Sequence, residues 1–216
     1  MTAPPLSPAH GLPGLLLAFE GIDGAGKTTQ LHALAALLRA EGRPVLTTKQ
    51  PTDGPWGRKI RAAAASGERL PIEDELHAFL EDRKLHVHEM IRPALEQGTA
   101  VLIDRYYFST IAYQGARGLD PVALQAQNEA IAPLPDATLL FEIDVDTALS
   151  RVAGRGAADA FERRDSLEAV AAVFAKITCP SITRISGIGA PNNVENALQN
   201  AIFTPNSHAV RWRNRG

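Results

Sequence analysis

The chain has 216 residues and a formal net charge of −2, with 22 Lys and Arg against 24 Asp and Glu, so it lacks the broad basic face needed for sequence-independent nucleic-acid binding. Its single cysteine, Cys179, excludes an internal disulfide and a cysteine-based metal cage and is typical of a reducing compartment. The longest apolar run, residues 169–175, is far shorter than the about 20 residues of a membrane helix, and residues 1–12 lack the Lys or Arg of a signal peptide. We therefore expect a cytoplasmic protein that binds neither membrane nor nucleic acid.

Short apolar runs alternate with longer amphipathic stretches along most of the chain. Residues 1–13 come first, and their four prolines predict a flexible leader. The later runs predict strands at Leu15–Phe19, Val45–Thr48, Ala100–Ile103, Ala137–Ile143 and, more weakly, Ile182–Ser186. Because these runs are continuous rather than alternating, the pattern predicts an α/β fold with a parallel sheet of about five strands and helices on both faces.

Two amphipathic stretches predict helices that flank this sheet. The first comes after the first strand, ends at Gly42, and has one apolar face made of Leu31, Leu34, Ala35 and Leu38. The second spans residues 73–95, with a stripe made of Leu76, Phe79, Leu80, Val87, Met90 and Ile91. On this helix His86 and His88 face different directions, so we interpret them as solvated side chains rather than as metal ligands.

A phosphate-binding motif follows the first predicted strand and opens the first predicted helix. Residues 21–28 fit G-x-x-x-x-G-K-[ST], in which glycines let backbone N–H groups surround a phosphate at a helix N-terminus. The lysine, Lys27, is expected to reach the β- and γ-phosphates, and the Thr28 hydroxyl to ligate Mg²⁺. The residues predicted to bind the ATP phosphates are Gly21, Ile22, Asp23, Gly24, Ala25, Gly26, Lys27, Thr28 and Thr29. The motif alone leaves open which group receives the phosphoryl.

An acidic residue and a basic residue follow the third predicted strand, at the edge of the sheet where ligands bind in this fold class. We expect Asp104 to complete the Mg²⁺ site opposite Thr28, and Arg105 to point into the same crevice. On the second predicted helix, Arg83 falls on the apolar stripe one turn after Phe79. Such an arginine has three interpretations: its stem extends along the edge of the stripe to solvent, it pairs with an internal acid, or its guanidinium binds a polar base or a phosphate. In the last case Phe79 offers a stacking face.

A cluster of arginines near residue 155 predicts a short mobile lid at about 151–165. Arg155 lies between two glycines, which give the segment freedom to move, and Arg151 and Arg163 lie on either side of it. Ala25 occupies a loop position where some phosphotransferases have an arginine. The charge of the transition state therefore needs a cation from elsewhere, and the lid can supply one. A plain basic surface is the alternative interpretation of this cluster.

Together these residues resemble the thymidylate kinase family of P-loop nucleoside monophosphate kinases, from about Leu15 to Phe203. The resemblance depends on the stretch 19–29, on Phe79-x-x-Asp82-Arg83, on residues 104–106, and on residues 113–115. It implies a three-layer P-loop fold, a homodimer, and transfer of the ATP γ-phosphoryl to dTMP with Mg²⁺. The rest of the chain then divides into a single kinase domain, residues 14–203, and a basic tail, residues 204–216, expected to be a solvated end.

The resemblance also implies roles for individual residues. Asp23 would hold the sugar 3′-hydroxyl, Arg105 the dTMP phosphate, and Arg83 the O4 edge of thymine. The remaining substrate-binding residues that it implies are Lys49, Phe79, Thr110, Tyr113 and Gln114, with Tyr113 crowding the 2′ position. The catalytic residues would be Lys27, Arg105 and a lid arginine, which is Arg155 in our assignment, with Arg163 and Arg151 open as alternatives.

The chain departs from the family pattern at three positions. After the second strand it has Lys49 and Gln50 where the family has Arg and Glu, and in the lid it has Ala160 where many members have arginine. These departures keep two alternatives open. One is a kinase for another nucleoside monophosphate or for a deoxynucleoside, with Asp23 or Glu20 as its base. The other is a P-loop protein that binds nucleotide without phosphoryl transfer.

Overall fold

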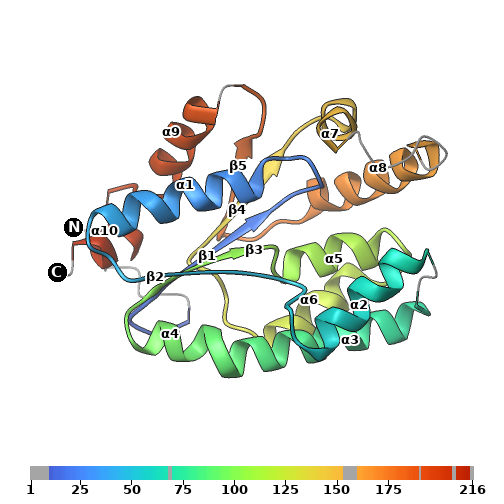
Figure 1. Ribbon diagram of the computed structural model, residues 1–216, viewed down its shortest axis with the longest axis horizontal. Coiled ribbons are helices and arrows are strands. Elements are labelled where there is room, and N and C mark those ends of the chain that lie inside the picture. The colour runs from blue at the N-terminus through green and yellow to red at the C-terminus, as the bar shows by residue number, and fades with distance from the viewer. Residues whose placement is uncertain (1–9, 68–69, 153–159, 190, 206–207, 215–216) are drawn as a thin grey trace.

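The computed structural model describes residues 10–67, 70–152, 160–189, 191–205 and 208–214. Five parallel strands form one sheet in the order β2-β3-β1-β4-β5, which confirms the predicted fold class (Figure 1). The strands are β1 (Leu15–Glu20), β2 (Val45–Lys49), β3 (Ala100–Asp104), β4 (Ala137–Glu142) and β5 (Ile182–Ser186). Each contains or closely matches the apolar run that predicted it.

Helices pack on both faces of the sheet. They are α1 (Lys27–Ala40), α2 (Pro55–Ser66), α3 (Ile72–His86), the π-helical turn η1 (Val87–Ile91), α4 (Arg92–Glu96), α5 (Tyr107–Gly115), α6 (Pro121–Glu129), α7 (Val145–Val152), α8 (Ala160–Lys176), α9 (Pro191–Ile202) and α10 (His208–Arg213). Figure 1 shows α1 and α9 on one side of the sheet and α3, α5 and α6 on the other. Among the described residues, no helix is both long and apolar enough to cross a membrane.

The central strand β1 supplies both hydrophobic cores because all six of its residues are buried. Leu15, Leu17 and Phe19 point to one face, where they pack with α1, α9 and α10. Leu16 and Ala18 point to the other face, where they pack with α3, α5 and α8. Alternate side chains of a strand face opposite sides, so a strand covered on both sides is apolar on both, as residues 15–19 are here.

The strand order positions the site. β1 and β3 are neighbours in the middle of the sheet, and Phe19 pairs with Asp104 at their carboxyl ends. The loop after β1 and the turn after β3 therefore leave the sheet side by side, which is where ligands bind in open parallel sheets.

The long predicted helix at residues 73–95 is interrupted by a π-helical turn, η1. A π-helical turn adds one residue to a turn and so changes the direction of the side chains within it, Met90 among them, and beyond it. Met90 is consequently exposed, not buried as the regular stripe predicted, while Ile91 and Leu95 are buried. The prediction for His86 was also wrong. Its side chain is buried and hydrogen-bonded, whereas His88 is exposed as expected.

The basic tail, expected to be a solvated end, contributes to the core instead. In α10, Trp212 is 4% exposed, and its indole N–H donates to the Gly98 carbonyl oxygen at 2.7 Å. Arg213 makes a bidentate ion pair with Glu41. At the other end of the chain, the leader is described only from His10, whose ring contacts the Asp136 carboxylate at 2.9 Å.

Candidate active site

The phosphate-binding loop lies between β1 and α1, as its motif requires. Gly21, Gly24 and Gly26 all have positive φ angles, a conformation that side chains disfavour. A Cβ atom on Gly24 would also lie 2.6 Å from the Ala148 carbonyl oxygen of α7, so glycine is required there by space as well. The loop therefore keeps the tight conformation in which N–H groups at the start of α1 face a bound phosphate.

Lys27 begins α1 and is almost fully buried, with 6% exposure. Its Nζ donates to the Ile22 carbonyl oxygen at 2.8 Å. Burial, with the nearby Arg105 charge, lowers its pKa to about 8. Lys27 lines a cavity of about 600 Å³ together with the phosphate-binding loop, Asp104, Arg105 and Arg151. A buried ammonium with one carbonyl partner gains the most from an anion in this cavity.

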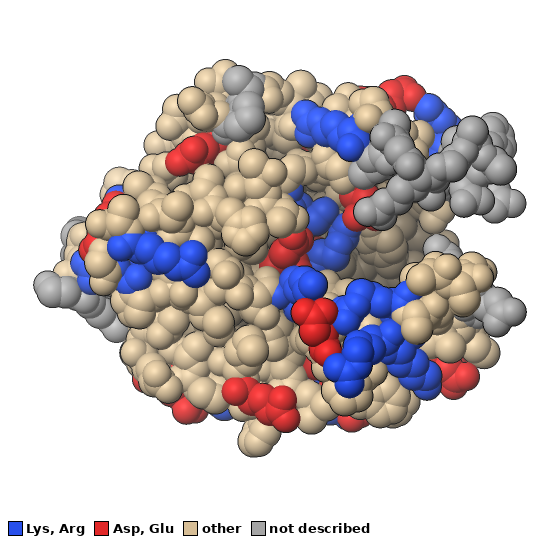
Figure 2. Space-filling model, viewed as in Figure 1, with Lys and Arg blue, Asp and Glu red and all other residues tan. Residues whose placement is uncertain are grey.

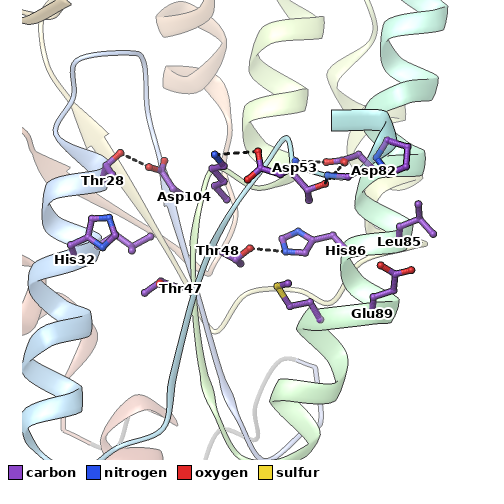
Figure 3. A pocket seen from close by; sticks show the side chains of 16 residues that line it. Thr28, His32, Thr47, Thr48, Asp53, Asp82, Leu85, His86, Glu89 and Asp104 are labelled. Atoms are coloured by element: carbon purple, nitrogen blue, oxygen red, sulfur yellow. Dashed lines mark hydrogen bonds and ion pairs between the residues drawn. The ribbon is translucent and has the colours of Figure 1, made fainter. Parts of the chain in front are cut away.

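Thr28 and Asp104 meet across the mouth of this cavity. The Thr28 hydroxyl donates to an Asp104 carboxylate oxygen, so the two residues predicted to share a metal lie in contact (Figure 3). A hydroxyl and a carboxylate are the hard oxygen donors that Mg²⁺ prefers, and Mg²⁺ takes few protein ligands when phosphates and water supply the rest. Among the described residues, no group of three or more His, Cys, Asp or Glu side chains is arranged to hold a metal ion.

Arg105 follows Asp104 in a left-handed conformation, with φ 64°. This uncommon backbone geometry turns the guanidinium back toward the phosphate-binding loop. There it donates to the Gly21 carbonyl oxygen at 3.1 Å and to Asp23 at 2.6 Å. Burial lowers the pKa of Arg105, but Tyr113, Asp23 and Glu20 together raise it above its ordinary value, so the group stays charged.

Glu20 supports Arg105 from beneath and has no solvent exposure. One carboxylate oxygen accepts the N–H groups of Tyr106 at 2.8 Å and Ser109 at 3.1 Å, and the other accepts the Ser109 hydroxyl at 2.5 Å. Ser109 in turn accepts from Arg105 at 3.0 Å. Burial raises the pKa of Glu20 and these hydrogen bonds oppose that shift. The sequence analysis missed Ser109. The available signal was Glu20, since an acid directly after five apolar strand residues is buried and needs hydrogen-bond donors such as Ser109.

A second cavity, of about 440 Å³, lies beside the first and shares Asp23 and Arg105 with it. It contains every predicted substrate-binding residue except Lys49, namely Asp23, Phe79, Arg83, Arg105, Thr110, Tyr113 and Gln114. The sequence analysis did not predict the helix α2, which supplies Ile60 and Arg61 to the cavity wall. Its signal was Pro55 at a first helical position after Gly54.

Arg83 lies at the base of this second cavity and is 1% exposed. Its Nε and Nη2 donate to Gln50 Oε1 at 3.0 and 2.9 Å, and Nη2 also donates to the Thr110 hydroxyl at 3.1 Å. Nη1 donates to the Asn128 side-chain oxygen. Burial lowers the pKa of Arg83 to about 10, so the group is still charged near neutral pH.

One buried polar atom at the second cavity, the Gln114 Nε2, has no hydrogen-bond partner among the described residues. Burying a polar atom without a partner costs about 1–3 kcal/mol, and a polar ligand in the cavity would remove that cost. The Tyr113 hydroxyl is also buried, and the Arg105 charge beside it opposes the rise that burial causes in its pKa. The Gln114 amide therefore favours a ligand with hydrogen-bonding groups in this cavity.

Lys49 lies outside the second cavity. At the end of β2 it lines a neighbouring groove of about 490 Å³ with Thr28, Asp104 and His86, and it pairs with Asp53 at 3.5 Å (Figure 3). The charged side chains on this face gather around the end of the sheet and over α2, where the surface is hollowed (Figure 2). A local cluster of charges thus exists in a chain of net charge −2.

Of the three predicted lid arginines, only the side chain of Arg151 lies in the part of the chain that the structure describes. Arg155 and the side chain of Arg163 lie outside the described residues. Arg151 lies in the last turn of α7 and donates to the carbonyl oxygens of Gly24 at 3.2 Å and Gly187 at 3.1 Å, so it joins the phosphate-binding loop to the loop after β5. Arg164 pairs with Asp146 and Glu168.

Comparisons with known proteins agree with this geometry. Residues 19–202 match the profile of the family described as thymidylate kinase. A thymidylate kinase of Akkermansia muciniphila is 44% identical over 189 residues, which cover 88% of this chain and 91% of that protein. One from Desulfotalea psychrophila is 42% identical over 85% of this chain and 91% of its own length. A probable thymidylate kinase of Archaeoglobus fulgidus is 48% identical over 74% and 80%.

Proposed function

This chain belongs to the thymidylate kinase family and is therefore an enzyme that phosphorylates dTMP to dTDP with ATP, and from this premise we propose how its two cavities divide the substrates. ATP occupies the cavity of the phosphate-binding loop, and dTMP occupies the cavity beside α3 and α5. The observation that carries this assignment is that Asp23 and Arg105 line both cavities. Two substrates that meet there have their phosphates end to end.

The dTMP cavity offers two cations. Arg105 is shared with the ATP cavity and receives the dTMP phosphate, with Asp23 beside it for the sugar 3′-hydroxyl. Arg83 lines the dTMP cavity alone and receives the thymine O4 edge, while Phe79 offers a ring for stacking. Thr110 and Gln114 lie near the base. The free Gln114 Nε2 is a donor that a pyrimidine carbonyl satisfies.

The reaction needs little covalent help from the protein. The second pKa of a phosphate monoester is about 6, so near pH 7 the attacking oxygen of dTMP is already largely ionised. A general base is therefore unnecessary. A deoxynucleoside acceptor would need one, but Glu20 has all its oxygens engaged by Tyr106 and Ser109 and no solvent exposure.

Catalysis then consists of positioning and of charge neutralisation. Lys27 turns from the Ile22 carbonyl to the transferring phosphoryl, and Arg105 holds the acceptor phosphate in line with it. Thr28 and Asp104 would hold Mg²⁺, which supplies charge neutralisation on the ATP phosphates when bound. We assign the remaining cation to the lid, with Arg155 or Arg163 as the source, because Arg151 is engaged by two backbone carbonyls.

We further propose a homodimer in the cytoplasm. The single free cysteine is in keeping with a reducing compartment. Leu85 of α3 and Met90 of η1 are large apolar side chains that stay exposed in one copy, and both lie on the same helical stretch. Light scattering coupled to gel filtration tests the dimer, since a mass of one chain at micromolar concentration contradicts it.

The acceptor assignment is tested by coupled ADP release with dTMP, dUMP, CMP, AMP and thymidine. We expect dTMP to give the highest kcat/KM and thymidine to give no turnover, because thymidine lacks the ionised oxygen. Lys27→Ala should abolish turnover with the fold retained. Nucleotide binding by the wild-type protein without phosphoryl transfer to any acceptor would favour the non-catalytic alternative instead.

A further inference from the structure

Three buried polar side chains form a continuous series of hydrogen bonds that begins at the second cavity, in which we place dTMP and which is called the thymidylate cavity below. Arg83 is 1% exposed, and Gln50 and His86 are each 5% exposed. Gln50 lies between the other two. Its side-chain oxygen accepts from Arg83, and its side-chain nitrogen lies 3.1 Å from His86 Nδ1. Beyond His86, the ring Nε2 lies 2.8 Å from the Thr48 hydroxyl (Figure 3).

The contacts of Arg83 determine the direction of each hydrogen bond in this series. A guanidinium only donates, so the Gln50 atom that faces it must be the amide oxygen. The opposite end of the amide is then the NH₂ group, which can only donate to His86 Nδ1. Nδ1 consequently carries no proton, and the neutral ring carries its proton on Nε2, from which it donates to Thr48. Burial lowers the pKa of His86 to about 4, which agrees with a neutral ring.

Arg83 depends on neutral acceptors for its orientation. Its hydrogen bonds to described residues go to Gln50, Thr110 and Asn128, while the nearby Asp82 carboxylate accepts from Thr52 instead. A carboxylate at position 50 would accept equally well through either oxygen. An amide accepts through one atom only, so it holds a guanidinium only in one of its two orientations. Arg83 favours the orientation in which the Gln50 oxygen faces it, and an acceptor for the Gln50 NH₂ group at the other end stabilises the same orientation further.

We propose that His86 is a positioning residue for recognition of the acceptor base: its neutral, Nε2-protonated ring selects the Gln50 orientation that holds Arg83 at the thymidylate cavity. The proposal depends on the placement of the base at Arg83 proposed above. His86 itself lines the neighbouring groove rather than the thymidylate cavity, so it acts through Gln50 and not by touching the substrate.

Two substitutions of His86 separate its two hydrogen bonds. The side-chain oxygen of Asn occupies the position of Nδ1, so His86→Asn keeps the acceptor for Gln50. The side-chain nitrogen of Gln reaches the position of Nε2, so His86→Gln keeps only the donor for Thr48. We expect the KM for dTMP to rise roughly fivefold to tenfold in His86→Gln and to stay within about twofold in His86→Asn, the difference of about one hydrogen bond. kcat and the KM for ATP should change little in either, because neither Arg83 nor His86 lines the cavity assigned to ATP.

The exposed His88 offers a matched control, since its Asn and Gln variants should both behave as wild type. An equal KM for dTMP in the two His86 variants would overturn the proposal, because a role in packing alone does not distinguish Nδ1 from Nε2. Thermal unfolding of each variant identifies any that fails to fold.

Nitrogen NMR of the wild-type histidines tests the proposal without any substitution. His86 should show the Nε2-protonated tautomer and should keep it at pH 5.5, which is below the ordinary histidine pKa of about 6.5. A proton on Nδ1, or a charged ring at that pH, would overturn the assignment. Arg83→Ala distinguishes the role of His86 from the placement of the base. If this change leaves the KM for dTMP unaltered, the proposed placement of the base is wrong, whereas a raised KM with no difference between the His86 variants refutes only the role of His86.

Discussion

Binding of ATP should be coupled to protonation of Lys27. In the free protein this lysine is 6% exposed, has one carbonyl partner, and has a pKa of about 8 instead of the ordinary 10.5. Phosphate oxygens at the ammonium stabilise its charged form, which returns the pKa to its ordinary range or above. Above pH 8 the free protein must therefore take up a proton in order to bind ATP.

The magnitude can be worked from the two pKa values. At pH 9 the free lysine is mostly neutral, so binding should take up about 0.9 of a proton, and at pH 7 about 0.1. Affinity should fall up to about tenfold for each pH unit above 8, which reaches roughly two orders of magnitude by pH 10. The phosphates of ATP do not titrate in this range, since their last pKa is near 6.

Calorimetry with a non-hydrolysable ATP analogue, in two buffers that differ in ionisation enthalpy, counts the protons directly. Lys27→Arg is the matched control, because a guanidinium stays charged and should give neither proton uptake nor the fall in affinity. An uptake near zero at pH 9 would refute the reasoning, as would the same uptake in the arginine variant.

Three further predictions concern stability and selectivity. Trp212→Ala should lower the free energy of unfolding by about 3–5 kcal/mol, because it empties a core site that the tail helix fills, whereas Asn214→Ala, at an exposed position, should change it by less than about 0.5 kcal/mol. Urea titrations measure both values, and equal losses in the two variants would contradict a tail that packs on the core. Since the pKa of His86 is about 4 in the folded protein and near 6.5 when unfolded, the unfolded state takes up the proton first, so stability should fall by about 3 kcal/mol as the pH drops from 6.5 to 4. His86→Asn should lack this part of the acid sensitivity, and urea titrations at several pH values that show the same loss in both proteins would disprove it. Tyr113→Ala should raise the ratio of kcat/KM for UMP to that for dUMP by about tenfold, because the ring that crowds the 2′ position is removed; an unchanged ratio would remove Tyr113 from that role.

The parts of the fold that could be predicted from the sequence are those encoded locally. Leu15–Phe19 and the loop after it are continuous in the chain, and the apolar run, the glycines and the lysine each have a meaning that neighbouring residues supply. Asp104 and Arg105 were placed correctly for the same reason, since a polar pair directly after a buried strand must emerge at the carboxyl edge of the sheet.

Met90 and His86 were misplaced for different reasons. A regular 3.6-residue repeat continued through residues 73–95 predicts a buried Met90, but η1 adds one residue to a turn and changes the direction of the side chains within it and beyond it. Nothing in the local sequence distinguishes that turn from ordinary helix. His86, by contrast, was misjudged because its partners Thr48 and Gln50 lie in another part of the chain, 38 and 36 residues away.

Long-range contacts account for the other errors. Trp212 is 114 residues from Gly98, the residue whose carbonyl accepts its indole N–H, so the arginine-rich composition of the tail suggested a solvated end. At Gln50 the sequence indicates only the loss of an acid. That a neutral amide bridges Arg83 and His86 cannot be read from it, because this requires knowing the orientation of three buried side chains.

The placement of the two substrates is tested most directly by a crystal structure with ADP and dTMP bound together. We expect the two phosphate groups to lie on either side of Arg105 and the thymine ring to lie between Phe79 and Arg83. A dTMP phosphate held by Lys49 in the neighbouring groove, with the cavity around Arg83 empty, would contradict this placement.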